Sequence, residues 1–426
     1  HDPATAYIAV TGYKLNDFTP YIFKTNDYGA TWTKIVNGIP GNTFARSVRE
    51  DPDRKGLLYA GTETGVFVSF TDGNLWLPLQ NNLPEVPITD LRVKRKDLVV
   101  ATQGRALWIL DDLTPLHQIS DEVAKADYYL YKPNDTHAEL SVAYSIDGGL
   151  GKNPPQGAQI HYVLNKAVDA DTSMSIEIMD ATGEVVHSEF TDMKKVGCDS
   201  LVKPQLKRKT GAHHYRWNMK VGRFDCLTEL YTTNRDLTAY NASPGKYTVQ
   251  FKVGEFTQTQ DFEIKIDPRI ANSIENAASA YKERDKISKS IYAGATEMAQ
   301  GVRDLQKIKQ QIDFVMGVTD NEAIKKNGTS LNNTVDEWIA EILQKEMRTF
   351  QSNYMFEARL LIKFKDFLNR IGKGNLPVTQ GTRDVTKDYL QQWSTLKSSL
   401  QDIKSSDVSK YNQLLKDAGL PELYWP

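Results

Sequence analysis

The chain has 426 residues, about three times the length of an ordinary domain, so more than one domain is expected. Hydrophobic residues make up 40% of the chain and charged residues 25%, the balance of a soluble globular protein. The formal net charge of −2 provides no basic excess for a dedicated nucleic-acid binder. No stretch approaches the ~20 apolar residues of a transmembrane helix.

Residues 1–118 are predicted to form short β-strands, because β-rich runs alternate with turns of Gly, Pro, Asn and Asp. An eight-residue pattern occurs twice in this region, at Thr25–Trp32 and Ser69–Trp76, and the two copies begin 44 residues apart. This spacing fits one four-stranded blade of a β-propeller. The predicted strands are Tyr7–Val10, Tyr21–Lys24, Leu57–Gly61, Val66–Ser69, Asp97–Ala101 and Ala106–Leu110.

Residues 119–134 are expected to be a linker, and residues 135–268 form a second β-rich zone without the repeat. Alternating segments there include Ser173–Met179 and Val185–Phe190, joined by a predicted hairpin turn at Asp180–Gly183. Six or seven strands in about 130 residues favour an immunoglobulin-like or fibronectin III-like β-sandwich.

Residues 270–426 change to helical periodicity. Four apolar stripes step by three or four residues, and Gly and Pro occupy the connections, which predicts an antiparallel four-helix bundle. The stripes lie within residues 287–315, 331–342, 360–371 and 389–403.

The eight-residue pattern resembles the Asp-box of bacterial neuraminidase repeats. Thr25–Trp32 matches it fully, whereas the second copy has Thr71 in place of the Asp. The stretches Val48–Val66 and Asp97–Asp112 also resemble bacterial sortilin-like propeller proteins, which are often labelled glycosyl hydrolases. In that family a small β domain and a helical tail follow the propeller.

The resemblance implies that residues 1–118 are the last blades of an incomplete propeller. Only about two and a half blades are visible, and a propeller needs at least about four to close. The chain is therefore expected to be the C-terminal portion of a larger protein, with the remaining blades of the same precursor as its partner. Family members usually carry His at the position of Gln103, so no proton-transfer role is expected there.

The repeat residues are interpreted as structural, because a carboxylate in a tight turn accepts main-chain hydrogen bonds and an indole fills the space between sheets. The structural set is Thr25, Asp27, Gly29, Trp32, Ser69, Gly73 and Trp76. Three charged residues are the catalytic candidates if the propeller is sialidase-like: Glu63, Arg49 and Arg105. The alternative is that these charges form ion pairs between blades or close turns.

Cys198 and Cys226 are expected to form a disulfide, since both lie in the β domain of a family that functions outside the reducing cytoplasm. The seven histidines show no zinc-binding spacing, and no phosphate-binding glycine loop is present. We therefore expect no metal and no cofactor.

Taken with the resemblance, these features indicate an extracytoplasmic propeller-based binding or assembly module, located in the periplasm, at the outer-membrane surface or secreted. Its ligand would be a protein of the cell surface or a glycan, and this chain alone would be catalytically silent. The alternative is a sialidase-like glycoside hydrolase whose active site lies mostly in further N-terminal blades.

Overall fold

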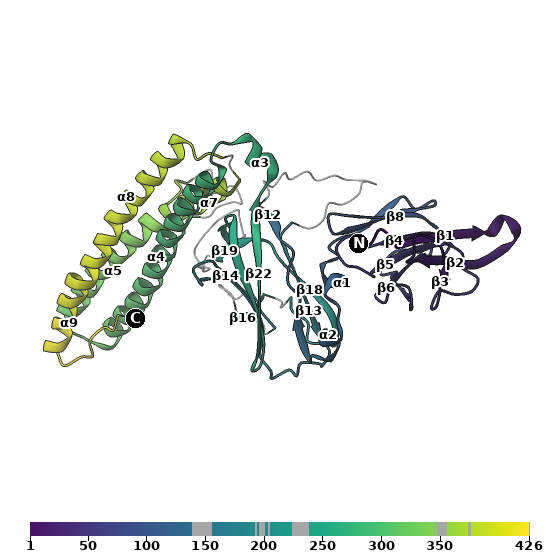
Figure 1. The fold of residues 1–426 in the computed structure, drawn as a ribbon. Coiled ribbons are helices and arrows are strands. Elements are labelled where there is room, and N and C mark those ends of the chain that lie inside the picture. Colours follow the sequence, from purple (N-terminus) through teal and green to yellow (C-terminus); the bar gives the residue numbers. More distant parts are fainter. Residues whose placement is uncertain are drawn as a thin grey trace. The chain divides into compact units, whose positions relative to one another are not determined.

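The computed structural model describes residues 1–138, 156–191, 194–195, 201–202, 205–223, 238–344, 346, 356–373 and 376–425. The chain folds as two compact units. Unit 1 contains residues 1–134 together with 161–166, and unit 2 contains the remaining described residues from 135 onward. The architecture combines β-sheets in both units with a cluster of helices in unit 2 (Figure 1). Both Cys198 and Cys226 lie outside the described residues, so their pairing stays a prediction.

Three antiparallel sheets follow one another along unit 1, and in each sheet the strands are hydrogen-bonded in sequence order. Sheet I contains β1 (Ala6–Gly12), β2 (Asp17–Thr25) and β3 (Thr33–Lys34), with a 3₁₀ turn, η1 (Tyr13–Leu15), between β1 and β2. Sheet II contains β4 (Ala45–Glu50), β5 (Leu58–Thr62), β6 (Val66–Ser69) and β7 (Leu77–Pro78). Sheet III contains β8 (Ile88–Lys94), β9 (Asp97–Thr102) and β10 (Leu107–Leu110).

All six strands predicted in this region are present, as β1, β2, β5, β6, β9 and β10. Sequence analysis missed β4 and β8, because polar residues such as Arg46, Arg49 and Asp90 interrupt their hydrophobic pattern.

Sheet II is covered on both faces by its neighbours. One face shares a core with the sheet I region. This core comprises Ile22, Ile35, Ile39, Ala45, Val48, Leu58, Ala60, Phe67 and Trp76. The opposite face contributes to a second core with sheet III, which comprises Leu57, Tyr59, Val66, Val68, Val86, Ile88, Leu91, Leu98, Val100 and Leu113. Because both of its faces are buried, sheet II shows how each strand position is packed when a neighbouring sheet covers it. Sheet II therefore provides the comparison for sheets I and III.

The rest of unit 1 follows sheet III. It contains α1 (Thr114–Gln118), α2 (Asp121–Lys125) and β11 (Tyr128–Leu130), which pairs antiparallel with Tyr162–Leu164 of β13 (Ala158–Leu164). Residues 119–134, expected as a linker, therefore include a helix and a strand. Val123 and Tyr131 pack with Val163 in a small core of their own.

A five-stranded sheet organises the β-rich part of unit 2. Its order is β12 (Thr136–Ala138), β22 (Phe256–Ile266), β21 (Gly245–Val253), β14 (Met174–Asp180) and β15 (Val185–Phe190). The predicted hairpin turn is present, with Asp180 accepting the main-chain N–H groups of Thr182 and Glu184. Trp217 packs edge-on against Tyr247 and Phe262. The other strands are β16 (Lys194–Lys195), β17 (Leu201–Val202), β18 (Gly211–Trp217), β19 (Lys220–Arg223) and β20 (Thr238–Asn241).

The helices of unit 2 follow the sheet, and the four predicted stripes lie on α4 (Ala277–Val318), α5 (Glu322–Ile342), α7 (Leu360–Lys373) and α8 (Gln380–Asp402). Figure 1 shows α4, α5 and α8 running alongside one another. In the part of unit 2 that the structure describes, three further helical segments were not predicted: α3 (Pro268–Ser273), the π-helical turn η2 (Ile403–Asp407) and α9 (Val408–Asp417). None of the helices described is apolar enough over a sufficient length to cross a membrane.

Candidate assembly interface

Strand pairing gives sheets I and II a common register. Ala6 pairs with Thr25 in sheet I, and Leu58 pairs with Ser69 in sheet II. Thr25 and Ser69 are also the first residues of the two repeat copies. Strand β1 therefore corresponds to β5, and each residue from Ala6 to Val10 corresponds to the residue 52 positions later in β5.

Sheets II and III share a register in the same way. The pairs Ala45–Thr62 and Ile88–Thr102 are each followed at once by a register shift, so β4 corresponds to β8 and β5 to β9. Val66 pairs with Gly61 in sheet II, and Leu107 pairs with Ala101 in sheet III. It follows that β10 corresponds to β6.

When the three sheets are aligned by this register, sheet II has four strands, and sheets I and III each have three among the described residues. Strand β5 lies between β4 and β6, whereas β1 is the edge strand of sheet I. Strand β6 pairs with β7, whereas β10 is the edge strand of sheet III. Within the described residues, the unpaired edge of β1 corresponds to the edge of β5 that pairs with β4. Likewise, the unpaired edge of β10 corresponds to the edge of β6 that pairs with β7.

The outer face of sheet I exposes apolar side chains whose counterparts in sheet II are buried. Ile8 is 41% exposed, although the corresponding Ala60 is 0% exposed. Val10 is 43% exposed, although the corresponding Thr62 is 0% exposed. Phe23 lies opposite Ile8 across the strand pair, which extends this apolar face onto β2. We call Ile8, Val10, Tyr21 and Phe23 the sheet I outer face.

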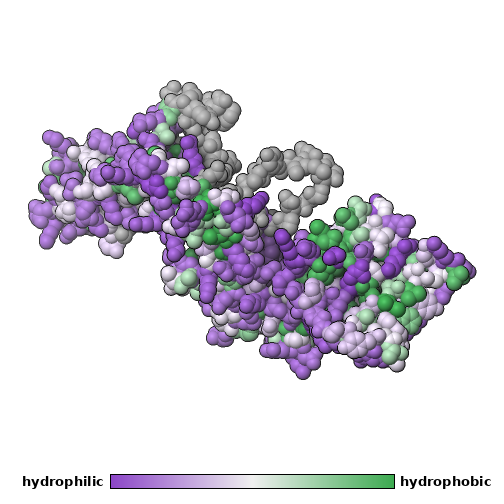
Figure 2. Space-filling model, turned by 45° about the horizontal axis from the view of Figure 1, so that its top comes forward, coloured by the Kyte–Doolittle hydropathy of each residue, from purple (hydrophilic) through white to green (hydrophobic). Residues whose placement is uncertain are grey.

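The outer face of sheet III shows the same contrast. Leu107 is 71% exposed and Ile109 is 57% exposed, whereas their counterparts Val66 and Val68 are 2% and 3% exposed. The side chains of Leu107 and Ile109 alternate with Trp108 and Leu110, which pack on the core shared with sheet II. We call Leu107 and Ile109, with Val99 opposite Ile109, the sheet III outer face. Figure 2 shows hydrophobic side chains reaching the surface of unit 1.

The first repeat copy folds as a hydrogen-bonded turn around Asp27. The Thr25 hydroxyl donates to Asp27 Oδ1 (2.7 Å) and accepts the Gly29 N–H (2.9 Å). Asp27 also accepts the Thr31 N–H (2.9 Å) and the Thr31 hydroxyl (2.5 Å). These bonds, led by the Thr31 hydroxyl, lower the pKa of Asp27 to about 2. Both oxygens of the carboxylate therefore bind donors of the turn, which fits the structural interpretation of Asp27.

The second copy keeps this turn without a carboxylate. The Ser69 hydroxyl accepts the Gly73 N–H (3.0 Å), as Thr25 does for Gly29. The Thr71 hydroxyl, which replaces Asp27, accepts the Leu75 N–H (3.0 Å). A single hydroxyl oxygen therefore takes over one of the main-chain contacts that Asp27 makes.

The two repeat tryptophans differ in their surroundings. Trp76 is 1% exposed and lies in the core between sheets I and II, where its Nε1 donates to the Ile35 carbonyl (2.9 Å). Trp32, expected to fill the space between sheets, is instead 42% exposed. Trp76 is buried because it packs against sheet I, which precedes its own sheet along the chain. Trp32 belongs to sheet I, and no described sheet precedes sheet I to cover it.

The catalytic candidates have separate partners. Glu63 forms an ion pair with Arg46 (2.6 Å), which stacks over the ring of Phe44. Arg49 forms an ion pair with Asp90 of sheet III (2.6 Å). Arg105 lies in the exposed turn between β9 and β10. The Arg49–Asp90 pair joins sheets II and III, as the structural alternative expects, whereas the Glu63–Arg46 pair lies within sheet II. The two pairs are separate and do not form the cluster of arginines that would hold a carboxylate substrate.

A buried carboxylate network joins α1 to sheet II, and sequence analysis did not find it. Asp51 is fully buried, and its Oδ2 accepts hydrogen bonds from Tyr59 (2.9 Å) and contacts His117 Nε2 at 2.9 Å. Its Oδ1 accepts the N–H groups of Asp53 and Arg54. Ligand atoms of Asp51, Asp53 and His117 lie within 4.8 Å of one another. Because both oxygens of Asp51 already bind protein donors, the network acts as a structural tie.

Comparisons with known proteins do not assign this chain to a family. No family model matches it, and no curated protein matches it. It is similar to the solved extracellular domain of a hybrid two-component system of B. thetaiotaomicron, with 11% identity, a TM-score of 0.18, and coverage of 59% of this chain and 29% of that one. It is also similar to an ancestral GH74 enzyme, with 9% identity, a TM-score of 0.17, and coverage of 61% and 34%. The chain spans about a third of the length of either, and likeness at these TM-scores carries no argument.

Proposed function

We propose that the chain belongs to a binding or assembly protein in which sheets I, II and III are successive blades of a β-propeller. The observation that carries this proposal is the exposure of Ile8, Val10, Leu107 and Ile109 at positions that are buried in sheet II. Sheet II has a neighbour on each face. Sheets I and III would acquire the same environment if one further sheet packed on each outer face.

The sheet I outer face and the sheet III outer face correspond to the two opposite faces of sheet II. The sheet I outer face corresponds to the face of sheet II that packs on sheet I. The sheet III outer face corresponds to the face of sheet II that packs on sheet III. Each outer face is therefore half of an interface whose other half is seen elsewhere in unit 1. Contacts of this head-to-tail type can close into a ring.

The energetics favour covering these faces. Removing a Leu or Ile side chain from water contributes about 1.5–3 kcal/mol. The free edges of β1 and β10 would also gain main-chain hydrogen bonds from an added strand. The partner we propose is accordingly the set of remaining blades of the same precursor.

We further propose an extracytoplasmic location and a cell-surface protein or glycan as the ligand of the completed assembly. The resemblance of the Asp-box to secreted and surface propellers supports this part of the proposal. The ion pairs of Glu63 and Arg49 support binding over glycoside hydrolysis, because the two charges pair with different partners, Arg46 and Asp90, and do not form one cluster.

Sedimentation velocity of the purified chain tests the proposal. Two complementary faces on one molecule should cause self-association that increases with protein concentration. Substitution of one face, by Leu107→Lys with Ile109→Lys or by Ile8→Lys with Val10→Lys, should abolish it. The control is Val185→Lys, because Val185 is 49% exposed in unit 2. A wild-type chain that stays monomeric at every concentration would contradict the proposal.

A further inference from the structure

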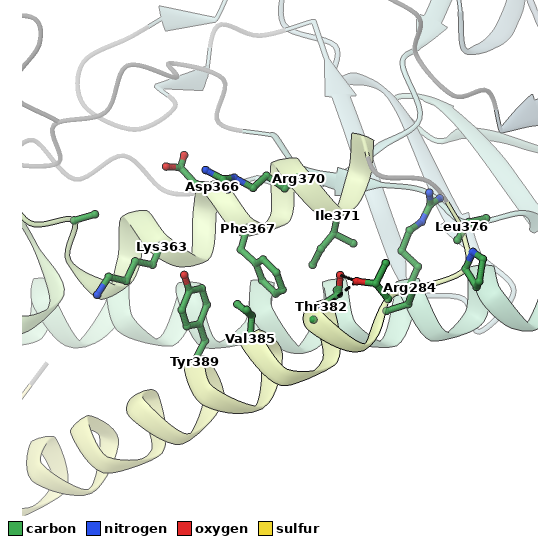
Figure 3. Close-up of a pocket in the computed structure, with 15 residues that line it drawn as sticks. Arg284, Lys363, Asp366, Phe367, Arg370, Ile371, Leu376, Thr382, Val385 and Tyr389 are labelled. Atoms are coloured by element: carbon green, nitrogen blue, oxygen red, sulfur yellow. Dashed lines mark hydrogen bonds between the residues drawn. The ribbon is translucent and has the colours of Figure 1, made fainter. Parts of the chain in front are cut away.

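A cavity of about 890 Å³ lies among the helices of unit 2. Figure 3 shows that its walls are α7 and the first turns of α8, with Arg284 reaching in from α4. The apolar lining residues are Ala358, Phe367, Ile371, Leu376, Pro377, Val378, Val385 and Tyr389. This volume is in the range of pockets that bind small organic molecules.

The charged residues of the lining differ in burial. Arg284 is buried, with 6% of its surface exposed, whereas Asp366 and Arg370 are exposed. Figure 3 shows Asp366 and Arg370 on the side of α7 that faces away from Phe367 and Ile371. Lys363 forms an ion pair with Glu357 (3.7 Å). Arg284 is therefore the buried charge of this lining.

No hydrogen bond or ion pair to a described residue satisfies the Arg284 guanidinium. Its contact is with the Tyr281 ring, whose centroid lies 4.6 Å from the guanidinium carbon. Burial lowers the pKa of Arg284 below its usual value. An arginine keeps its proton under these conditions, so its guanidinium presents five N–H donors beside the cavity, and none of them bonds to a described residue. A largely buried charge of this kind is stabilised when a group of opposite charge pairs with it.

The start of α8 adds to the positive potential of the cavity. Thr379 caps the helix by accepting the Thr382 N–H (3.2 Å), and its hydroxyl contacts the Thr382 hydroxyl (3.0 Å). The cavity is lined by Thr379, Gly381 and Thr382, so it meets the first turn of a 23-residue helix. A helix N-terminus favours a negative charge nearby.

We propose that this cavity binds an apolar molecule that carries one carboxylate. The guanidinium of Arg284 would pair with the carboxylate through two parallel hydrogen bonds. The apolar part would lie between Phe367, Ile371 and Val385. A single buried cation matches a monoanion, whereas a phosphate dianion would bring a second charge into an apolar surrounding.

Isothermal titration of the full chain with decanoate tests the proposal. We expect decanoate to bind the wild type and to bind Arg284→Met at least tenfold more weakly. Decanol, which lacks the charge, should bind both proteins with equal affinity. Arg383→Met is the matched control, because Arg383 lies on α8 but pairs with Glu283 at 2.7 Å outside this lining. It should bind decanoate as the wild type does.

A second variant keeps the test valid if Arg284→Met fails to fold. Val385→Trp leaves Arg284 in place and fills the cavity from the half-exposed side of α8, so decanoate binding should be lost. Equal decanoate affinity of the wild type and either cavity variant would overturn the proposal. The absence of decanoate binding to the wild type at about 1 mM would also overturn it, since this corresponds to a negligible affinity.

Discussion

The indole Nε1 of Trp76 donates a 2.9 Å hydrogen bond to the carbonyl oxygen of Ile35, across the interface between sheets II and I. The same side chain is 1% exposed. This contact joins the end of the second repeat copy to the residue that follows β3, and it helps to fix the position of sheet II relative to sheet I. The repeat turn thus contributes to packing between sheets as well as to the turn itself.

Trp76→Ala should reduce the free energy of unfolding of unit 1 by about 3–5 kcal/mol, because it leaves a large cavity and removes the hydrogen bond to Ile35. Trp32→Ala is the matched control, and it should cost about 1 kcal/mol or less since Trp32 is 42% exposed. Urea unfolding followed by circular dichroism measures both values. Equal losses for the two variants would contradict the assignment of Trp76 as the inter-sheet residue.

Asp27→Ala should lower the melting temperature of unit 1 by a few degrees and leave ligand binding by the folded protein unchanged. The reason is that the Thr31 N–H and the Thr25 and Thr31 hydroxyls lose their acceptor. Differential scanning calorimetry measures the effect, with Asn26→Ala as the control at an exposed neighbouring position. A variant that keeps its melting temperature but loses a binding activity would show that Asp27 is functional.

His187 should make unit 2 less stable in mild acid. Burial, with a smaller effect of the Arg223 charge, lowers its pKa from 6.5 to about 4. The unfolded chain therefore binds a proton between about pH 6.5 and pH 4 that the folded chain rejects, so stability falls as the pH falls through this window. The full shift corresponds to about 3 kcal/mol.

Urea unfolding at pH 7 and pH 5 tests this dependence. His187→Phe should remove most of the difference between the two pH values, because the phenyl ring can keep the stacking on Trp217 without a titrating nitrogen. His137→Phe, at an exposed position of β12, should keep the difference. If both variants behave like the wild type, another group controls the pH dependence.

Local patterns in the sequence predicted most strands and long helices, because alternation and helical stripes reflect burial directly. Strands β4 and β8 were not predicted, because charged residues such as Arg49 and Asp90 interrupt their apolar pattern. These two side chains form an ion pair between the strands, which the sequence pattern does not show. The Asp51–His117 contact joins residues 66 positions apart, and local spacing carries no signal for it. The position of Arg284 beside the cavity likewise depends on the packing of α4, α7 and α8, which periodicity alone does not specify.

Residues 1–118 expressed alone should be insoluble or associate without limit. The fragment retains the cores on both sides of sheet II and the contact of Asp51 with His117. It would therefore have the means to fold, and its failure would come from the outer faces of sheets I and III and the free edges of β1 and β10.

Matched fragments separate these causes. Leu107→Lys with Ile109→Lys blocks one outer face, and this fragment should be recovered as a soluble species by size-exclusion chromatography. Val66→Lys is the opposite control, because Val66 is the buried counterpart of Leu107 and its substitution should prevent folding altogether. A wild-type fragment that is monodisperse and melts cooperatively would contradict the prediction. In that case Ile8, Val10, Leu107 and Ile109 would be ordinary surface residues, and the case for further blades would lose its main support.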